Sequence, residues 1–278
     1  MALTLMYITN DIEVALIAEK YGVERIWIDL ETLGKEERQK GMNSVKSCHT
    51  VADVRRIAPY LTKSRLLVRV NPLYEGSFKE IDEVINAGAD LVMLPMWKTC
   101  EEVKTFISAV NGRAKTVLLL ETKEAVECLE SVLAVPGIDE IHIGLNDLHL
   151  SYGLTFMFEL LSNGTVERIC NKIKAKGILY GFGGIAKLRT GELPAEKIVL
   201  EHYRLGSTRA ILSRSFCNTD IITDLSEIDQ IFKKNIFELR QYETTVAENA
   251  DEELFEKNRV DVAQGVRAIV ENKKLKEQ

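Results

Sequence analysis

Short, nearly continuous apolar runs alternate along the chain with longer stretches in which apolar residues recur every three or four positions. Runs such as IWID, LLVRV and VLLLE are typical of strands buried on both faces of a parallel sheet. They predict strands at Leu3–Ile8, Arg25–Asp29, Leu66–Val70, Leu91–Pro95, Thr116–Glu121, Glu140–Gly144, Leu179–Phe182 and Arg209–Ser213. The longer stretches are typical of amphipathic helices. They predict helices at Ile12–Tyr21, Val51–Tyr60, Phe78–Ala87, Glu101–Val110, Lys123–Val135 and Val166–Lys176.

This alternation of strands and helices predicts one closed (β/α)8 barrel, a TIM barrel of the α/β class. A doubly wound open sheet is the structural alternative, but the G-x-G-x-x-G motif that would favour it does not follow the first strand. We expect the barrel domain to occupy residues 1–220 and a C-terminal helical extension to occupy residues 221–278. The extension contains helical patterns over about Ile228–Val246 and Glu252–Lys273. It either covers its own barrel or serves as an arm for oligomerisation.

Composition excludes several classes of protein. The 278 residues are 46% hydrophobic and 28% charged, with a net charge of −6, and the basic residues are scattered among acids. This distribution argues against binding to nucleic acid. Apolar runs fall short of the ~18–20 residues that cross a bilayer, and the sequence MALTLMYITND lacks the basic start of a signal peptide. Five cysteines without a C-x-x-C pair indicate reduced thiols. We therefore expect a cytoplasmic protein that binds neither nucleic acid nor membrane.

Charged residues end several of the predicted strands, and in a TIM barrel these ends carry the catalytic groups. Glu121 and Asp147 follow the fifth and sixth strands, which are neighbours. A charge at such a place is costly unless it is paired or bound to a metal ion. Two carboxylates without a suitably spaced cysteine or histidine match a hard cation that keeps water ligands, Mg²⁺ or Mn²⁺.

Arg69 lies in the third strand, and its planar guanidinium can bind a carboxylate with two hydrogen bonds. Residue types alone leave two interpretations open: a contact with an anionic substrate, or a salt bridge that neutralises the acids. The other polar residues at the strand ends are Asp29 and Glu31, after the second strand, and Ser213 and Arg214, after the eighth.

The histidines and one glycine-rich segment have less specific patterns. His142 lies inside the sixth strand and is expected to pack in the core, whereas His49, His149 and His202 are expected in loops or on helix surfaces. His149 is close enough to Asp147 in sequence to approach the site. The segment GFGGI after Tyr180 is typical of a turn, and it also allows a close approach of the backbone to an anion.

Four short motifs follow one another along the chain: AGADLVMLP, LLLET, AVPGID and GLNDL. Their order and spacing resemble those of the HpcH/HpaI aldolase/citrate lyase family. The resemblance extends from about Val23 to Leu154. The resemblance implies a divalent-metal-dependent carbon–carbon lyase, or aldolase, for small carboxylates of the pyruvate, oxaloacetate or acyl-CoA type. It also implies a homo-oligomer.

The resemblance assigns roles to individual residues. Glu121 and Asp147 match the metal-binding acids, for Mg²⁺ or Mn²⁺. Arg69 matches the substrate-binding arginine, and Asp29 and Glu31 match the acidic residues after strand two and are expected to be catalytic. Two residues at the end of the strand-four motif are expected to contact the substrate, Pro95 and Met96.

Two positions depart from the family pattern. The aldolase branch carries D-x-E-H after strand two, but Thr32 stands in place of the histidine linked to proton transfer. That branch often has Gln where this chain has Leu119. The citrate lyase branch carries D-L-E-D, and Thr32 replaces its last acid as well. The catalytic base is therefore open, with a metal-bound water, Glu31 or a group from a neighbouring subunit as candidates.

These patterns favour a lyase that acts on a 2-keto acid through an enolate. Two alternatives remain at this stage: another keto-acid or phosphoenolpyruvate enzyme of a biosynthetic pathway, and a catalytically impaired barrel that binds a small anion. The aldehyde or acyl partner, the metal used and the number of subunits do not follow from the sequence.

Overall fold

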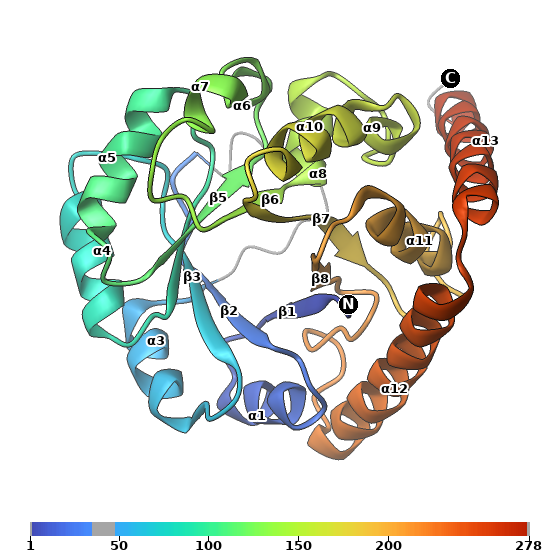
Figure 1. The fold of residues 1–278 in the computed structure, drawn as a ribbon. Coiled ribbons are helices and arrows are strands. Elements are labelled where there is room, and N and C mark those ends of the chain that lie inside the picture. The colour runs from blue at the N-terminus through green and yellow to red at the C-terminus, as the bar shows by residue number, and fades with distance from the viewer. Residues whose placement is uncertain (1, 35–47, 277–278) are drawn as a thin grey trace.

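The computed structural model describes residues 2–34 and 48–276, and its strands form a closed, entirely parallel barrel (Figure 1). Each strand pairs with the next, and β1 pairs with β8. The strands are β1 (Thr4–Ile8), β2 (Arg25–Asp29), β3 (Arg65–Arg69), β4 (Leu91–Leu94), β5 (Lys115–Leu120), β6 (Glu140–Ile143), β7 (Leu179–Ile185) and β8 (Arg209–Leu212). The predicted TIM barrel is confirmed.

Helices surround the barrel and alternate with its strands (Figure 1). They are α1 (Ile12–Lys20), α3 (Val51–Ile57), α4 (Ser77–Asn86), α5 (Cys100–Val110), α6 (Lys123–Glu127), α7 (Leu129–Val132), α8 (Leu145–Ser151), α9 (Glu159–Ser162), α10 (Thr165–Lys174) and α11 (Ala195–Leu205). Two predicted helices are shorter than expected. Pro59 ends α3 in a 3-10 turn, Ala58–Tyr60, because proline cannot continue the α-helical hydrogen bonds. The helix expected over Lys123–Val135 is divided at Cys128 into α6 and α7.

The C-terminal extension consists of α12 (Leu225–Asn249) and α13 (Glu252–Lys276). α12 packs on the barrel between α1 and α11 (Figure 1), where Asp229 pairs with Lys20 and Arg240 pairs with Glu24. α12 therefore takes the position of the eighth helix of the ring. α13 lies outside the ring against α9 and α11. The division at residue 220 and the role of the extension in oligomerisation stay predictions.

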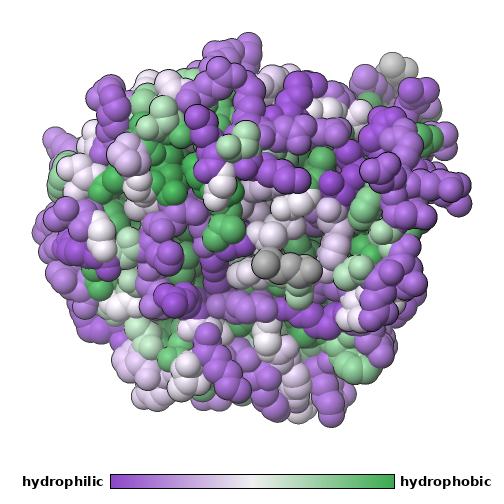
Figure 2. Space-filling model, in the orientation of Figure 1, coloured by the Kyte–Doolittle hydropathy of each residue, from purple (hydrophilic) through white to green (hydrophobic). Residues whose placement is uncertain are grey.

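Figure 2 shows that hydrophilic side chains predominate over α12 and α13 on the face seen there. Among residues 2–34 and 48–276, no helix is both long and apolar enough to span a membrane.

Side chains in the interior of the barrel form a separate small cluster: Met6, Trp27, Leu67, Leu91, Met93, Val117 and Leu119. A charged layer closes the amino-terminal end of this interior. Arg25 of β2 reaches across to Glu140 of β6 with two hydrogen bonds of 2.6 Å, and Arg209 of β8 donates to the same carboxylate at 3.1 Å. Buried charges are stable when they are paired in this way. This charged layer closes the barrel interior at the end opposite to the carboxyl ends of the strands.

His202 of α11 is fully buried and stacks on Phe182, with ring centroids 3.9 Å apart. Burial disfavours the charged ring and lowers the pKa of His202 to about 3. Between pH 6.5 and that value the unfolded chain binds the proton and the folded chain does not, so the free energy of unfolding falls as the pH falls.

Replacing His202 should therefore reduce the acid sensitivity of the fold. Between pH 7 and pH 5, the free energy of unfolding of a His202→Gln variant should fall by about 2 kcal/mol less than that of the wild type. Urea unfolding at the two pH values measures the difference. Equal losses in both proteins would show that His202 is already charged in the folded state.

Candidate active site

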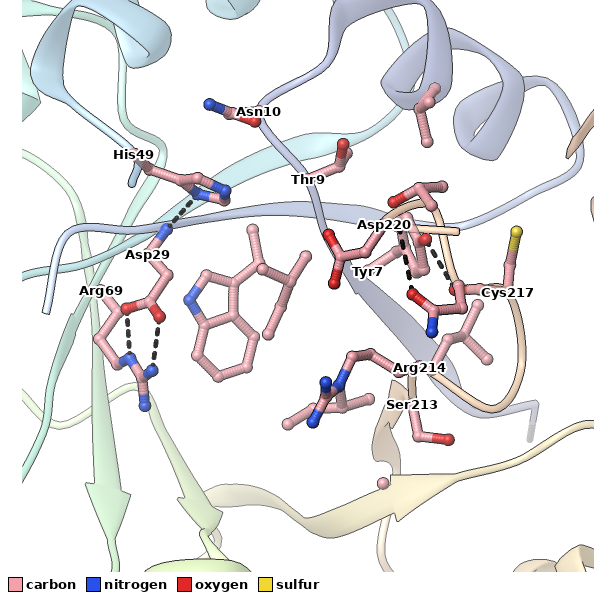
Figure 3. A pocket seen from close by; sticks show the side chains of 18 of the residues that line it. Tyr7, Thr9, Asn10, Asp29, His49, Arg69, Ser213, Arg214, Cys217 and Asp220 are labelled. Atoms are coloured by element: carbon pink, nitrogen blue, oxygen red, sulfur yellow. Dashed lines mark hydrogen bonds and ion pairs between the residues drawn. The ribbon is translucent and has the colours of Figure 1, made fainter. Parts of the chain in front are cut away.

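A cavity of about 590 Å³ opens at the carboxyl ends of the barrel strands. Figure 3 shows three residues on one side of it: Asp29 of β2, Arg69 of β3, and His49 from the segment before α3. The opposite side carries Arg214 and Asp220, from the segment that follows β8. The carboxylates of Glu121, directly after β5, and Asp147, in α8 after β6, also belong to its wall. The structure thus brings together in one cavity most of the residues predicted at the strand ends.

Arg69 is held on one side by the two acids after β2. Its Nε and Nη2 each donate to an oxygen of Asp29 at 2.8 Å, and its Nη1 lies 3.2 Å from Oε2 of Glu31 (Figure 3 shows the pair with Asp29). The guanidinium also lies over the ring of Trp27, 5.3 Å from its centroid. Arg69 is therefore oriented by three neighbours before any ligand binds.

The electrostatics of this group keep the arginine charged. Burial alone lowers the pKa of Arg69, but the charges of Asp29 and Glu31 outweigh burial and raise the pKa above its usual value. The salt bridge that the sequence offered as one interpretation of Arg69 is therefore present, because Asp29 and Glu31 are both ion-paired with Arg69. Because Arg69 also lines the cavity, this pairing does not exclude contact with a substrate.

Glu121 and Asp147 meet on the next part of the wall. Glu121 is buried, and burial followed by the charge of Asp147 raises the pKa of Glu121 well above its usual value, whereas Arg69 opposes this shift. Oδ1 of Asp147 is buried and has no hydrogen-bond partner among the described residues. The two carboxylates repel each other, and a cation bound by both would relieve the repulsion.

The donor set fits a hard divalent cation. Both candidate ligands are carboxylates, and in the described part of the chain no group of three or more His, Cys, Asp or Glu forms a closed metal cluster. Mg²⁺ is commonly held by one or two carboxylates and completes its shell with water and substrate oxygens. Glu121 and Asp147 would therefore hold the ion with open positions for a ligand.

Pro95 and Met96 are not part of the described cavity lining, but Met96 contacts Glu121. The backbone N–H of Met96 donates to Oε1 of Glu121 at 3.0 Å, and Met96 has a left-handed φ of 53°. Met96 therefore positions Glu121. A direct contact of either residue with the substrate stays a prediction.

Two histidines line the cavity in the described structure, a position that the sequence did not predict for either of them. His49, expected in a loop, accepts a hydrogen bond of 3.0 Å from the backbone N–H of Asp29 (Figure 3). His142 is buried as expected, but its ring also reaches the cavity. His149 bonds within α8 to the carbonyl of Leu145 and is not part of the described lining. Only the closure of the barrel brings His49 and His142 to one site.

The segment GFGGI forms the end of β7, and Gly183 and Gly184 line the cavity. The pairing with β8 shifts register between Gly181 and Gly184, which bends the strand. A Cβ on Gly181 would lie 2.3 Å from the carbonyl oxygen of Arg209, so that position requires glycine. The segment is therefore a strand irregularity rather than a turn.

The sequence profile of the HpcH/HpaI aldolase/citrate lyase family matches residues 5–182, which is more than half of the chain. The chain belongs to this family. The resemblance seen in the motifs is thereby confirmed. Enzymes of the family act on small molecules and generally depend on a divalent metal ion.

Individual relatives agree with this membership. A 2-keto-3-deoxy-L-rhamnonate aldolase of Salmonella gallinarum is 29% identical over 160 residues, which are 45% of this chain and 57% of the relative. The protein of the same name from Escherichia coli K12 is 26% identical over 164 residues, 47% of this chain and 58% of the relative. The matches thus span little more than half the length of these relatives.

Solved structures share the fold. An HpcH/HpaI aldolase from Desulfitobacterium hafniense DCB-2 superimposes with a TM-score of 0.58 at 15% identity, covering 76% of this chain and 86% of that chain. A family member from Burkholderia cenocepacia J2315 gives a TM-score of 0.59 at 15% identity, covering 82% and 95%. At this identity the likeness supports the barrel fold alone.

Proposed function

We propose that this protein is a divalent-metal-dependent carbon–carbon lyase that cleaves or forms a bond next to the carbonyl of a 2-keto acid. The observation that carries the proposal is the pair Glu121 and Asp147, with a partnerless buried oxygen on Asp147, in the same cavity as the oriented Arg69. The names of the curated relatives, which are aldolases of a 2-keto acid, support the same substrate class.

The chemical difficulty of this reaction is the enolate that forms beside the carbonyl. The metal ion, when held by Glu121 and Asp147, supplies a Lewis acid that spreads this negative charge. Arg69 adds a fixed positive charge in the same cavity. Because Asp29 and Glu31 already orient the guanidinium, no free energy is needed to reorient it during the reaction. Mg²⁺ and Mn²⁺ both suit two carboxylate ligands.

The residues after β2 do not supply an obvious base. Thr32, in place of the family histidine, is exposed and donates from its backbone N–H to Oδ1 of Asn71 at 2.8 Å. The carboxylate of Glu31 is ion-paired with Arg69, with Oε2 lying 3.2 Å from Nη1. The cytoplasmic location and the homo-oligomer stay predictions.

Deuterium exchange into the methyl group of pyruvate tests the proposal without knowledge of the second substrate. With Mg²⁺ or Mn²⁺ present, the protein should accelerate exchange, and excess chelator should abolish the acceleration. Exchange that is unaffected by chelator would contradict the metal-dependent mechanism. Metal binding without any exchange would favour a barrel that binds a small anion and does not catalyse.

Gly144 provides a further prediction because it packs directly against the carboxylate. A Cβ at this position would lie 2.9 Å from Oε2 and 3.0 Å from Cβ of Glu121. Gly144→Ala should displace the carboxylate and lower metal-dependent exchange by roughly 10- to 100-fold with little loss of thermal stability. Gly265→Ala in α13 is the control and should keep the wild-type rate. Normal exchange in Gly144→Ala would show that the position of Glu121 is unimportant.

A further inference from the structure

The loop that carries Glu31 is anchored to the end of β3 by one side chain. Oδ1 of Asn71 accepts the backbone N–H groups of Thr32 and Leu33 at 2.8 and 3.0 Å, and the hydroxyl of Thr32 at 3.3 Å. Asn71 lies two positions after Arg69 and is not part of the described cavity lining. A single amide oxygen therefore holds the two residues that directly follow Glu31.

Glu80 of α4 binds the other end of the Asn71 amide. Its Oε1 accepts Nδ2–H of Asn71 at 2.8 Å and the backbone N–H of the same residue at 3.2 Å. Burial raises the pKa of Glu80, and both hydrogen bonds from Asn71 oppose this shift because they favour the carboxylate. A carboxylate only accepts hydrogen bonds, so it keeps the NH₂ group of Asn71 on the side of the helix and the amide oxygen on the side of the loop.

The second oxygen of Glu80 is unfavourable for the stability of the fold. Oε2 is buried and has no hydrogen-bond partner within residues 2–34 and 48–276. Burial of a carboxylate with one unsatisfied oxygen costs free energy. Glu80 therefore orients Asn71 in spite of a loss of stability, and the reason for its presence is to be sought in the loop that Asn71 holds.

The anchored loop carries the acid that faces the arginine of the site. Glu31 is only 3% exposed, and its backbone N–H donates to Oδ1 of Asp29 at 3.1 Å. Its carboxylate lies 3.2 Å from Nη1 of Arg69. Asp29 fixes the backbone at Glu31, and Asn71 fixes the two residues after it. The backbone of Glu31 is thus held on both sides while the side chain orients the guanidinium.

We infer that Asn71 and Glu80 are positioning residues for the proposed reaction, because they hold the loop after β2 where its acids orient Arg69. Glu80 sets the orientation of the amide, and the amide sets the position of the loop. Both residues act through Glu31 and not by contact with substrate or metal. The inference rests on the proposed function for the reaction itself, whereas the anchoring of the loop is tested independently of it.

Hydrogen–deuterium exchange of the backbone amides, followed by nuclear magnetic resonance, tests the anchor without turnover. The N–H groups of Thr32 and Leu33 belong to exposed residues and should be protected by their bonds to Asn71. In Asn71→Ala both should exchange about tenfold faster or more, because each loses a hydrogen bond. Asn86→Ala is the matched control, since Nδ2 of Asn86 bonds within α4 to Asp82. Unchanged protection in folded Asn71→Ala overturns the anchor.

Charge placed inside the pair tests its role in the reaction. Asn71→Asp keeps the oxygen that faces the loop but sets a carboxylate against Glu80, so it should lower kcat of metal-dependent pyruvate exchange by about 10- to 100-fold. KM should change less than kcat, and the affinity for Mn²⁺ should stay within about threefold of the wild type, because Glu121 and Asp147 are untouched. Asn71→Ala introduces no charge and should give a loss of the same order, which covers the case that Asn71→Asp does not fold.

Glu80→Gln provides the comparison that a merely structural role would not pass. In the wild-type background it replaces a charged acceptor by a neutral one and should lower kcat by about two- to tenfold. In the Asn71→Asp background it should instead raise kcat, because the glutamine amide can donate to the new carboxylate. Losses from unrelated structural damage add and do not change sign. Glu83→Gln is the matched control and should change neither rate, since Glu83 is exposed on the same helix and pairs with Lys79.

The outcomes separate this inference from the proposed function. Additive losses in the double variant, or a normal kcat in folded Asn71→Asp, overturn the positioning pair. Absence of pyruvate exchange in the wild type contradicts the proposed function alone. Amide exchange then still decides on the pair: protection of Thr32 and Leu33 that is lost in Asn71→Asp must return when Glu80→Gln is added, and its failure to return overturns the role of Glu80.

Discussion

Glu121→Gln and Asp147→Asn should each reduce metal-dependent pyruvate exchange by roughly a thousandfold or more, because each removes one of the two charges that hold the cation, and metal-ion catalysis contributes several kcal/mol to such reactions. Both substitutions preserve shape. They also remove the repulsion between the two carboxylates, which adds to burial in raising the pKa of Glu121 in the wild type. Thermal stability without metal should therefore be unchanged or slightly higher.

This combination of lost activity and retained stability distinguishes a functional site from a structural ion pair. Breaking a buried salt bridge usually destabilises the fold. Glu196→Gln is the matched control, because Oε2 of Glu196 is also buried without a described partner but α11 lies away from the cavity lining. It should keep full activity. Normal metal-dependent exchange in Glu121→Gln and Asp147→Asn would contradict the assignment of the metal ligands.

Arg69→Lys should lower exchange by about 100- to 1000-fold although the positive charge is retained. A lysine ammonium cannot make the two parallel hydrogen bonds to Asp29, so it would not hold its charge where the enolate forms. The loss should appear in kcat more than in KM, because a charge that stabilises the enolate acts in the transition state.

Arg65→Lys is the control for this change, since Arg65 begins the same strand and is exposed at the opposite end of the barrel. It should leave the rate unchanged. An Arg69→Lys enzyme with the wild-type rate would show that Arg69 only neutralises Asp29 and Glu31.

The fold and the main acids of the site were predictable for a physical reason. Parallel strands buried on both faces require nearly continuous apolar runs, so a charged residue such as Glu121 at the end of a run is conspicuous. The C-terminal end of every strand lies at one face of the barrel, and this rule alone predicts that Arg69 and Glu121 share a site.

Contacts between distant segments were not predictable in this way. His49 contacts Asp29, which lies twenty positions earlier in the sequence, and periodicity does not report where the chain returns after such a separation. His142 has the pattern of a core residue, and only the closed barrel shows that its layer also borders the cavity. The position of α12 in the ring, beside Lys20, likewise depends on packing that follows from closure.

A crystal structure with Mn²⁺ and oxalate, an analogue of the pyruvate enolate, tests the central claim most directly. Anomalous scattering locates the Mn²⁺ ion independently of any assumption about its ligands. We predict one peak in the cavity, coordinated by carboxylate oxygens of both Glu121 and Asp147, with oxalate bound to the ion and within hydrogen-bonding distance of Arg69. A peak held by other residues, or oxalate bound away from the ion and Arg69, would contradict the proposed mechanism.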